Sequence, residues 1–394
     1  VDGFPLLEDL RPHLTPQDRS QFDSRALDAM RYGEQLYGIP ASQDCLSLIF
    51  NKDLFDAEGL DYPDESWDEQ DLLLAAQLLT QQDRQGLALP IKTAYWWFPI
   101  QEGYGGSLFD EFGNPTLDSN GSSEAMRWML DLELEYEVVA TGTQIEGMKN
   151  QFIASQAAMI VDGPWNWATY EDSRLNLGQT LLPLVNQSGE RMSPLVTYKG
   201  WTVSKQSAYK VASTELALWL SSESVQKEFA LETYTMPTHT ALDDDQEILN
   251  DEVISGFLDQ TKVATPAPTT RAMALVYGPL STAFEQAYTE EATTSDALSN
   301  ANDELKSLIE NLQKADPVST NLGYRTIDVN ITTDGSSNYT IFVDGVLHTE
   351  LVIDNGQGNI SQGYDNCTAD GVELNVLGSV RLFSQSANTI TCSL

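Results

Sequence analysis

The sequence has few of the side chains that bind metal ions or form disulfide bonds. Its 394 residues include three cysteines and three histidines, and no two cysteines have the Cys-x-x-Cys spacing of a zinc or redox motif. We therefore expect neither a metal site nor a cofactor. Cys45 lies in an apolar run, which indicates a buried, unreactive thiol. Cys367 and Cys392 lie near the C-terminus, where a disulfide bond between them would add stability in an oxidising compartment.

Positive charge is also scarce. The chain has 21 lysines and arginines against 59 aspartates and glutamates, which gives a formal net charge of −38. Such a surface repels the phosphates of nucleic acids and of anionic lipids, so neither is an expected partner. The acidic residues are scattered, which favours a solvated surface adapted to salty surroundings. Dedicated calcium sites are the alternative, although the sequence has no D-x-[DN]-x-[DN]-G loop.

Long apolar runs are missing as well. No segment approaches the roughly 20 consecutive apolar residues that cross a bilayer. Residues 1–14 have neither the basic start nor the apolar core of a signal peptide. Two interpretations fit this start: a leader has been removed, or the chain begins inside a longer one.

Helical and strand patterns alternate up to about residue 316, which predicts an α/β region. Residues 46–50 and 157–161 are short apolar runs typical of buried strands. Apolar residues at helical spacing predict three helices. The first contains Ala125, Trp128, Met129 and Leu132 after capping serines at Ser122 and Ser123, the second begins with Leu216, Trp219 and Leu220, and the third contains Leu298, Ala301, Leu305, Leu308, Ile309 and Leu312.

The composition changes after Pro317. Residues 319–394 are rich in Thr, Ser, Asn and Gly, and residues 326–331 alternate between apolar and polar side chains. Residues 339–343 and 346–353, joined by Asp-Gly, predict a hairpin with a type I′ turn. With further strands expected within residues 372–383 and 389–394, we predict a small all-β sandwich or incomplete barrel.

The most informative segment is residues 157–167, with the sequence AAMIVDGPWNW. An apolar strand ends at Asp-Gly-Pro, and two tryptophans follow in the loop, where a surface site can form. Further aromatic residues have similar strand-end or loop settings: Tyr95, Trp96, Trp97, Trp201 and Tyr277. Flat aromatic faces beside short carboxylates suit a ligand with one apolar face and many hydroxyl groups, and sugars have both features.

Several segments, taken in order, resemble the extracellular solute-binding proteins of ABC importers, in particular the maltose/maltodextrin-binding group. Residues 152–167 are similar to the signature F-x-x-G-x-A-A-M-x-x-x-G-P-W, except that Ser155 and Gln156 replace its Gly-Lys/Glu. The other matching segments are residues 30–40, 45–54, 104–109, 112–115 and 236–238, together with the region of Tyr277. The resemblance covers roughly residues 5–315.

This resemblance implies a two-lobed periplasmic-binding-protein-like fold. Lobe one would comprise residues 1–42 and 196–248, lobe two residues 43–195 and 249–316, and the β-domain residues 317–394. The sequence differs from this family in two ways. The residues that normally precede the segment aligned with Gly3–Leu7 are absent, so lobe one is expected to be truncated or completed by another chain. The family also does not ordinarily have the C-terminal β segment.

The resemblance also implies a set of ligand-binding residues. Asp44 aligns with a carboxylate that accepts hydrogen bonds from sugar hydroxyls, Trp165 with the principal stacking indole, and Tyr95 and Trp96 with an aromatic pair. The acidic residue that usually precedes this pair is replaced by Thr93, and Tyr277 stands where the family often has an indole. Trp201 could face either the cleft or the core, and Arg271 could bind hydroxyls or pair with a surface acid. We expect Trp97, Phe98 and Trp167 to pack in the core, whereas Asp162 could cap the turn or touch the ligand.

The expected function is to bind a maltodextrin-like oligosaccharide outside the cytoplasm, in the periplasm or at the cell surface, and to deliver it to an ABC permease. The hinges would lie near residues 43–46 and 194–199, with a third crossing near residues 246–250. Two alternatives stay open. A glycoside hydrolase needs two carboxylates on opposite sides of one bond, and no motif singles out such a pair. A structural subunit of a filament or surface layer could instead assemble as a homo-oligomer through exposed edges of the β-domain.

Overall fold

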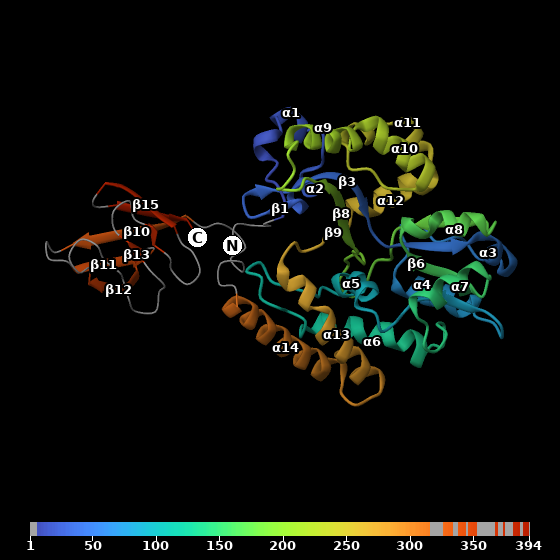
Figure 1. The fold of residues 1–394 in the computed structure, drawn as a ribbon. Helices are drawn as coiled ribbons and strands as arrows, with labels where there is room; N and C mark the ends of the chain where they lie inside the picture. The colour runs from blue at the N-terminus through green and yellow to red at the C-terminus, as the bar shows by residue number, and fades with distance from the viewer. Residues whose placement is uncertain are drawn as a thin grey trace. The chain divides into compact units, whose positions relative to one another are not determined.

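The computed structural model describes residues 6–315 and, beyond them, residues 326–333, 338–343, 346–352, 367–368, 373–374, 381–386 and 389–393, with side chains as far as residue 312. The chain divides into two compact units (Figure 1). The larger unit contains residues 8–31 and 36–307, and the smaller contains residues 1–7, 32–35 and 308–394.

A buried four-stranded sheet with the strand order β5-β6-β4-β7 lies in the larger unit (Figure 1). β4 (Ser47–Asn51) pairs antiparallel with β6 (Ala157–Asp162) and with β7 (Leu177–Thr180), while β5 (Gln85–Ala88) is parallel to β6. Every residue of β4 and β6 is buried, as expected for strands of mainly apolar sequence in the middle of a sheet. The strands predicted at residues 46–50 and 157–161 are confirmed.

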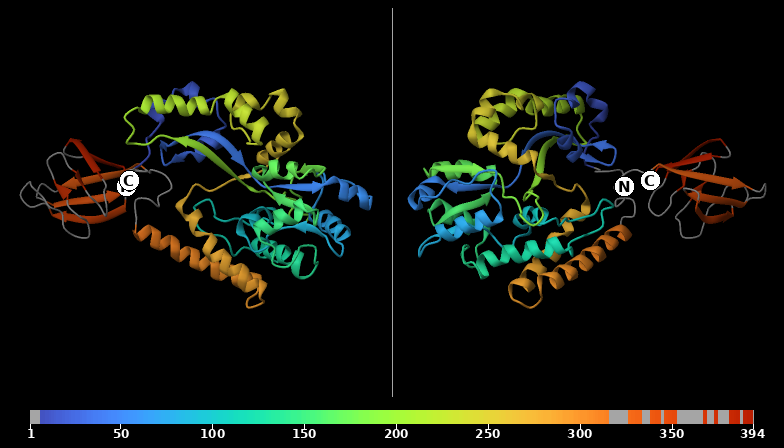
Figure 2. Two further views of the ribbon diagram at one scale, coloured as in Figure 1. Left: turned by 45° about the vertical axis from the view of Figure 1, so that its right-hand side comes forward. Right: turned by 180° about the vertical axis from the view of Figure 1, so that it is seen from behind.

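A second sheet, which we call the hinge sheet, has the order β3-β8-β9. β3 (Gly38–Asp44) is antiparallel to β8 (Leu195–Thr202), and β9 (Thr265–Pro266) is parallel to β8. Figure 2 shows β3 and β8 running side by side through the middle of this unit. Because β4 follows β3 after two residues, residues 45–46 join the hinge sheet to the four-stranded sheet.

Cys45 lies at this junction and is a buried free thiol. It packs with Val196 and Ala264, and burial, together with the neighbouring Asp44, raises the pKa of its thiol. The prediction of a buried Cys45 is confirmed. Residues 246–250, near which the third crossing is predicted, form a short helix, and β9 is the third strand of the hinge sheet. The position of the third crossing stays a prediction.

Helices account for most of the remaining structure, and no helix in the described part of the chain is both long and apolar enough to span a bilayer. They are α1 (Pro16–Arg19), α2 (Ser24–Ala29), α3 (Lys52–Glu58), α4 (Glu69–Leu79), α5 (Ala94–Gly103), α6 (Asn120–Leu134), α7 (Ile145–Ile153), α8 (Trp167–Asp172), α9 (Lys210–Leu220), α10 (Glu223–Thr233), α11 (Gln246–Asn250), α12 (Glu252–Lys262), α13 (Tyr277–Tyr288) and α14 (Thr294–Ala315). Short 3₁₀ turns and strands complete the set: η1 (Arg11–His13), η2 (Pro164–Asn166), η3 (Thr240–Leu242), η4 (Arg271–Leu275), β1 (Arg31–Tyr32) and β2 (Gln35–Leu36).

The three predicted helices are present, with differences at their ends and faces. α6 begins at Asn120 and is capped by Ser119, whose hydroxyl accepts from the Ser122 amide, so the expected caps at Ser122 and Ser123 lie inside the helix. On α9, Leu216 and Trp219 are exposed, and the helix buries Thr214 and Ala217 instead. α14 ends at Ala315, before Pro317, as predicted.

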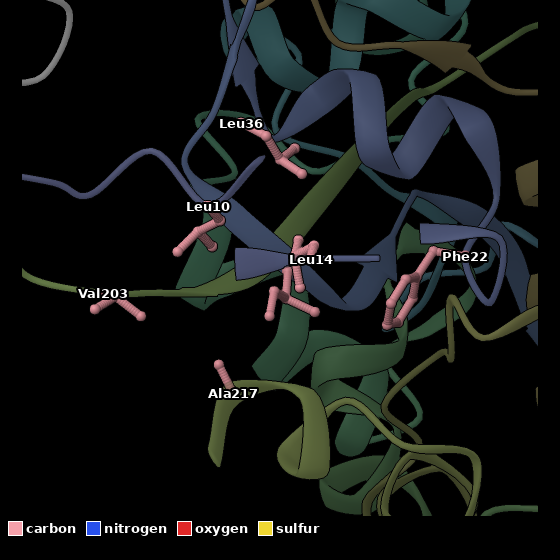
Figure 3. Close-up of a cluster of buried hydrophobic side chains, with 7 residues drawn as sticks. Leu10, Leu14, Phe22, Leu36, Val203 and Ala217 are labelled. Carbon is pink, nitrogen blue, oxygen red and sulfur yellow. The ribbon is translucent and has the colours of Figure 1, made fainter. Parts of the chain in front are cut away.

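A small core lies beside the hinge sheet (Figure 3). It contains Leu10, Leu14, Phe22, Leu36, Ile39, Val203 and Ala217. Ile39 is on β3, Val203 follows β8 and Ala217 is on α9, so this core attaches the N-terminal segment to the sheet and to α9.

The C-terminal strands form a five-stranded antiparallel sheet with the order β12-β11-β10-β16-β15 and a separate pair, β13-β14. Their bounds are β10 (Thr326–Thr333), β11 (Asn338–Val343), β12 (Val346–Val352), β13 (Cys367–Thr368), β14 (Glu373–Leu374), β15 (Arg381–Ser386) and β16 (Thr389–Ser393). β11 pairs antiparallel with β12, with Val343 opposite Val346, at the positions expected for the predicted hairpin. The turn type, the packing of these strands into a sandwich and the Cys367–Cys392 disulfide lie outside the described residues and side chains, and they stay predictions.

Candidate functional site

The turn after β6 presents an indole at the surface. The backbone leaves the buried strand at Asp162 and forms η2, and the Trp165 side chain folds back over Gly163. A Cβ atom added at Gly163 would lie 2.1 Å from the Trp165 ring, so only glycine leaves room for the indole in this position. Trp165 is 44% exposed, so part of its indole is open to solvent.

Asp162 stabilises this turn through hydrogen bonds. Its buried carboxylate accepts hydrogen bonds from the Gly163 amide at 2.9 Å, from Asn166 Nδ2 at 2.9 Å and from the Tyr170 hydroxyl. Burial raises the pKa of Asp162, while these three donors oppose the shift. Of the two predicted roles for Asp162, capping the turn accounts for its contacts.

Tyr95 lies next to Trp165, on the first turn of α5. The two ring centroids are 6.5 Å apart, with an angle of 51° between the ring planes. Burial raises the pKa of Tyr95 well above its usual range, and nearby Cys45, Asp44, Tyr277 and Asp162 raise it further. Tyrosine is protonated at neutral pH even without this shift, so the phenol can donate a hydrogen bond. Asp44 and Tyr277, like Tyr95, are predicted site residues, and both act electrostatically on the Tyr95 hydroxyl.

Tyr277 approaches the same helix from α13. Its ring centroid lies 5.9 Å from that of Phe98, which follows Tyr95 by three residues on α5. Tyr277 is 43% exposed, and burial of the rest of the side chain raises its pKa. We call Tyr95, Trp165 and Tyr277 the aromatic cluster.

Asp44 ends β3 and is 5% exposed. Its carboxylate forms an ion pair with the ammonium group of Lys199, on the neighbouring strand β8. The carboxylate predicted to accept from the ligand is thus already paired with a cation that the sequence analysis did not single out.

Trp96 lies in the interior. It is 6% exposed, and its Nε1 donates to the Val161 carbonyl at 2.7 Å, at the end of β6. The ring also meets Tyr95 edge-on, with centroids 5.4 Å apart. Trp96 is therefore buried against Tyr95, and a contact between its ring and a ligand stays a prediction.

Trp201 and Arg271 are the remaining predicted site residues. Trp201 is on β8, opposite Ile39, and is 41% exposed, so it does not belong to the core. Arg271 begins η4, the exposed segment that leads into Tyr277.

The expected packing residues are confirmed, and one has an additional contact. Trp97 and Phe98 are buried, and Trp167 packs against Phe257 and Tyr234. Phe98 also supports the Tyr277 ring, a contact that its spacing from Tyr95 on α5 could have indicated.

The site therefore combines exposed aromatic rings with hydrogen-bonding groups. The rings can stack on an apolar ligand face, while the Asp44 carboxylate and the Tyr95 hydroxyl can accept and donate hydrogen bonds. Within the part of the chain that the structure describes, no three His, Cys, Asp or Glu side chains form a group able to hold a metal ion.

Comparisons with known proteins show the family and the fold of this chain. Residues 5–227 match the family of bacterial extracellular solute-binding proteins. A galactooligosaccharide-binding protein of Bacillus subtilis is 25% identical over 314 residues, which cover 77% of this chain and 73% of that protein. A maltooligosaccharide ABC transporter solute-binding lipoprotein of Streptococcus pneumoniae is 24% identical over 292 residues, covering 71% of this chain and 66% of the lipoprotein.

A solved structure has the same fold. The cyclo/maltodextrin-binding protein complexed with maltotetraose superposes with a TM-score of 0.69, at 24% sequence identity, over 78% of each chain. This similarity confirms the predicted two-lobed α/β fold.

Proposed function

The chain belongs to the bacterial extracellular solute-binding proteins, and we propose that it binds a neutral oligosaccharide outside the cytoplasm and delivers it to an ABC permease in the membrane. The aromatic cluster carries this proposal. Trp165 and Tyr277 are each more than 40% exposed, although large aromatic side chains usually pack in the interior. Their rings, the Tyr95 hydroxyl and the Asp44 carboxylate match the apolar faces and hydroxyl groups of a sugar.

Two related proteins have names that support this ligand class, since one binds galactooligosaccharides and the other belongs to a maltooligosaccharide transporter. Glucose and galactose oligomers share pyranose rings and many hydroxyl groups. We therefore propose a short neutral oligosaccharide as the ligand class and leave its linkage to experiment.

The proposed mechanism is closure of two lobes around the ligand. β3 and β8 join the lobes, so bending of residues 43–46 and 194–199 would bring groups on the two sides together. A ligand that contacts both sides stabilises the closed state, because that state has contacts that the open state lacks. Neither a covalent step nor a cofactor is needed, so we propose that the protein is not an enzyme.

Calorimetric titration tests this function directly. We expect heat of binding with maltotriose or with a β-linked galactotriose, and no release of reducing ends during prolonged incubation. Absence of binding to both sugars would contradict the proposed ligand class. Release of reducing ends that is lost on one Asp or Glu substitution would instead support a glycoside hydrolase. The filament alternative has no support in the comparisons.

A further inference from the structure

Lys199 occupies a central position on the hinge sheet. In the register of the two strands, Lys199 lies opposite Ser42 and Thr197 lies opposite Asp44. Lys199 and Asp44 are therefore diagonal neighbours on one face of the strand pair, within reach of a long side chain. The strand register shifts between Pro40 and Ser42, directly next to the position where Ser42 lies opposite Lys199. Such irregularities commonly redirect side chains.

The two partners differ in their access to solvent. The Asp44 side chain is 8% exposed, whereas the Lys199 side chain is 63% exposed. Among the described residues, Lys199 supplies the one hydrogen bond that the Asp44 carboxylate accepts, and Asp44 is the one acceptor for the Lys199 ammonium group. A carboxylate accepts about four hydrogen bonds and an ammonium group donates three, so both retain capacity for a ligand.

Trp201 extends this arrangement along β8. Residues two apart on a strand point to the same side, so Lys199 lies between Asp44 and Trp201 on one face of the hinge sheet. Trp201 and Lys199 are both exposed. This face thus presents an indole, an ammonium group and a carboxylate in sequence.

We propose that Lys199 is a ligand-binding residue, and that its ammonium group and the Asp44 carboxylate together bind two adjacent hydroxyl groups of a neutral sugar. One hydroxyl donates to the carboxylate, and the oxygen of the next accepts from the ammonium group. The ligand therefore needs a vicinal diol at this position, and it contacts the hinge strands themselves. This inference rests on the proposed function.

The test is calorimetric titration of Lys199→Met with maltotriose and with a β-linked galactotriose. Lys205→Met is the matched control, because Lys205 is exposed just after β8 and has no ion pair in the described structure. We expect Lys199→Met to bind the preferred sugar about 10- to 100-fold more weakly, as for loss of a hydrogen bond to a charged group. Lys205→Met should match wild type, and Lys199→Arg should retain part of the affinity because it keeps a cationic donor.

Wild-type affinity in Lys199→Met would overturn the inference and leave the proposed function intact. Tighter binding would also overturn the inference, because Lys199 would then block the access of the ligand to Asp44 instead of binding the ligand. Failure of the wild-type protein to bind either sugar would contradict the proposed function and this inference with it. If the unpaired Asp44 prevents Lys199→Met from folding, the double variant Asp44→Asn/Lys199→Met removes that charge. Wild-type affinity in the double variant would overturn the inference equally.

Discussion

At the scale of single residues, Trp165 is the residue that we propose to stack on the sugar. It is exposed and held over Gly163, and it lies beside Tyr95. We predict that Trp165→Ala weakens oligosaccharide binding by roughly 1–3 kcal/mol, because an aromatic anchor is lost. Calorimetry measures the change, with Trp219→Ala as the control, since Trp219 is an indole 60% exposed on α9. Equal affinities in the two variants would remove Trp165 from the site.

Glu102 gives the protein a pH-dependent stability. It follows Phe98 by four residues on α5, and burial raises the pKa of Glu102 to about 7. The folded state therefore binds this proton more tightly than the unfolded state does. The resulting stabilisation is complete below the ordinary glutamate pKa and is lost as the pH rises through about 7.

We predict that Glu102→Gln abolishes this loss. Between pH 5 and pH 8, the wild-type free energy of unfolding should fall by roughly 2 kcal/mol relative to that of Glu102→Gln. Urea unfolding at both pH values measures the difference. Glu111→Gln is the control, because Glu111 lies on an exposed turn, and it should follow wild type. Parallel curves for wild type and Glu102→Gln would exclude a raised pKa.

The candidate site could be predicted only in part from the sequence. Strand-end or loop settings are predicted for Trp165 and Tyr277, and both side chains are exposed, although Tyr277 begins the helix α13. The orientation of neighbouring residues on α5 could not be predicted, because which helix face meets the sheet depends on tertiary packing. Tyr95 thus faces Trp165, whereas Trp96, one residue on, donates its N–H to Val161. Lys199 was missed because its partner is 155 residues away in the chain.

At the scale of elements, α6 shows how helix ends are determined. Ser119, Ser122 and Ser123 all stand near its start, and only the Ser119 hydroxyl accepts from an amide of the first turn. We predict that Ser119→Ala lowers the free energy of unfolding by about 1 kcal/mol, the usual effect of losing an N-cap. Ser119→Asp should restore it, because aspartate also caps helices well. Equal denaturant midpoints for Ser119→Ala and Ser119→Asp would contradict this assignment.

Local sequence patterns predicted the positions of helices and strands better than they predicted which of their side chains are buried. β4 and β6 are short apolar runs, and both are strands at the expected positions. α9 is a helix as expected, but Leu216 and Trp219 point to solvent. Helical spacing indicates that residues share a face, and it does not indicate what covers that face. The pairing of β3 with β8 joins segments about 155 residues apart, so local patterns could not predict it.

At the scale of the whole molecule, the formal net charge of −38 is the feature with the clearest consequence for stability. Like charges repel in the compact state, and added salt screens that repulsion. We predict that the unfolding temperature rises as sodium chloride is increased from low to molar concentration. Differential scanning calorimetry measures the change, with sucrose at equal osmolality as the control. An unfolding temperature that falls with salt would contradict a stability limited by charge repulsion.

The central claim is that one oligosaccharide binds to the aromatic cluster beside Asp44. The most direct test is a crystal structure of the protein with the sugar that gives heat in calorimetry. We expect a pyranose ring stacked on the Trp165 indole, with Tyr95 and Tyr277 in contact and ring hydroxyls bound by Asp44 and Lys199. A sugar bound away from Trp165, with these side chains unchanged, would contradict it.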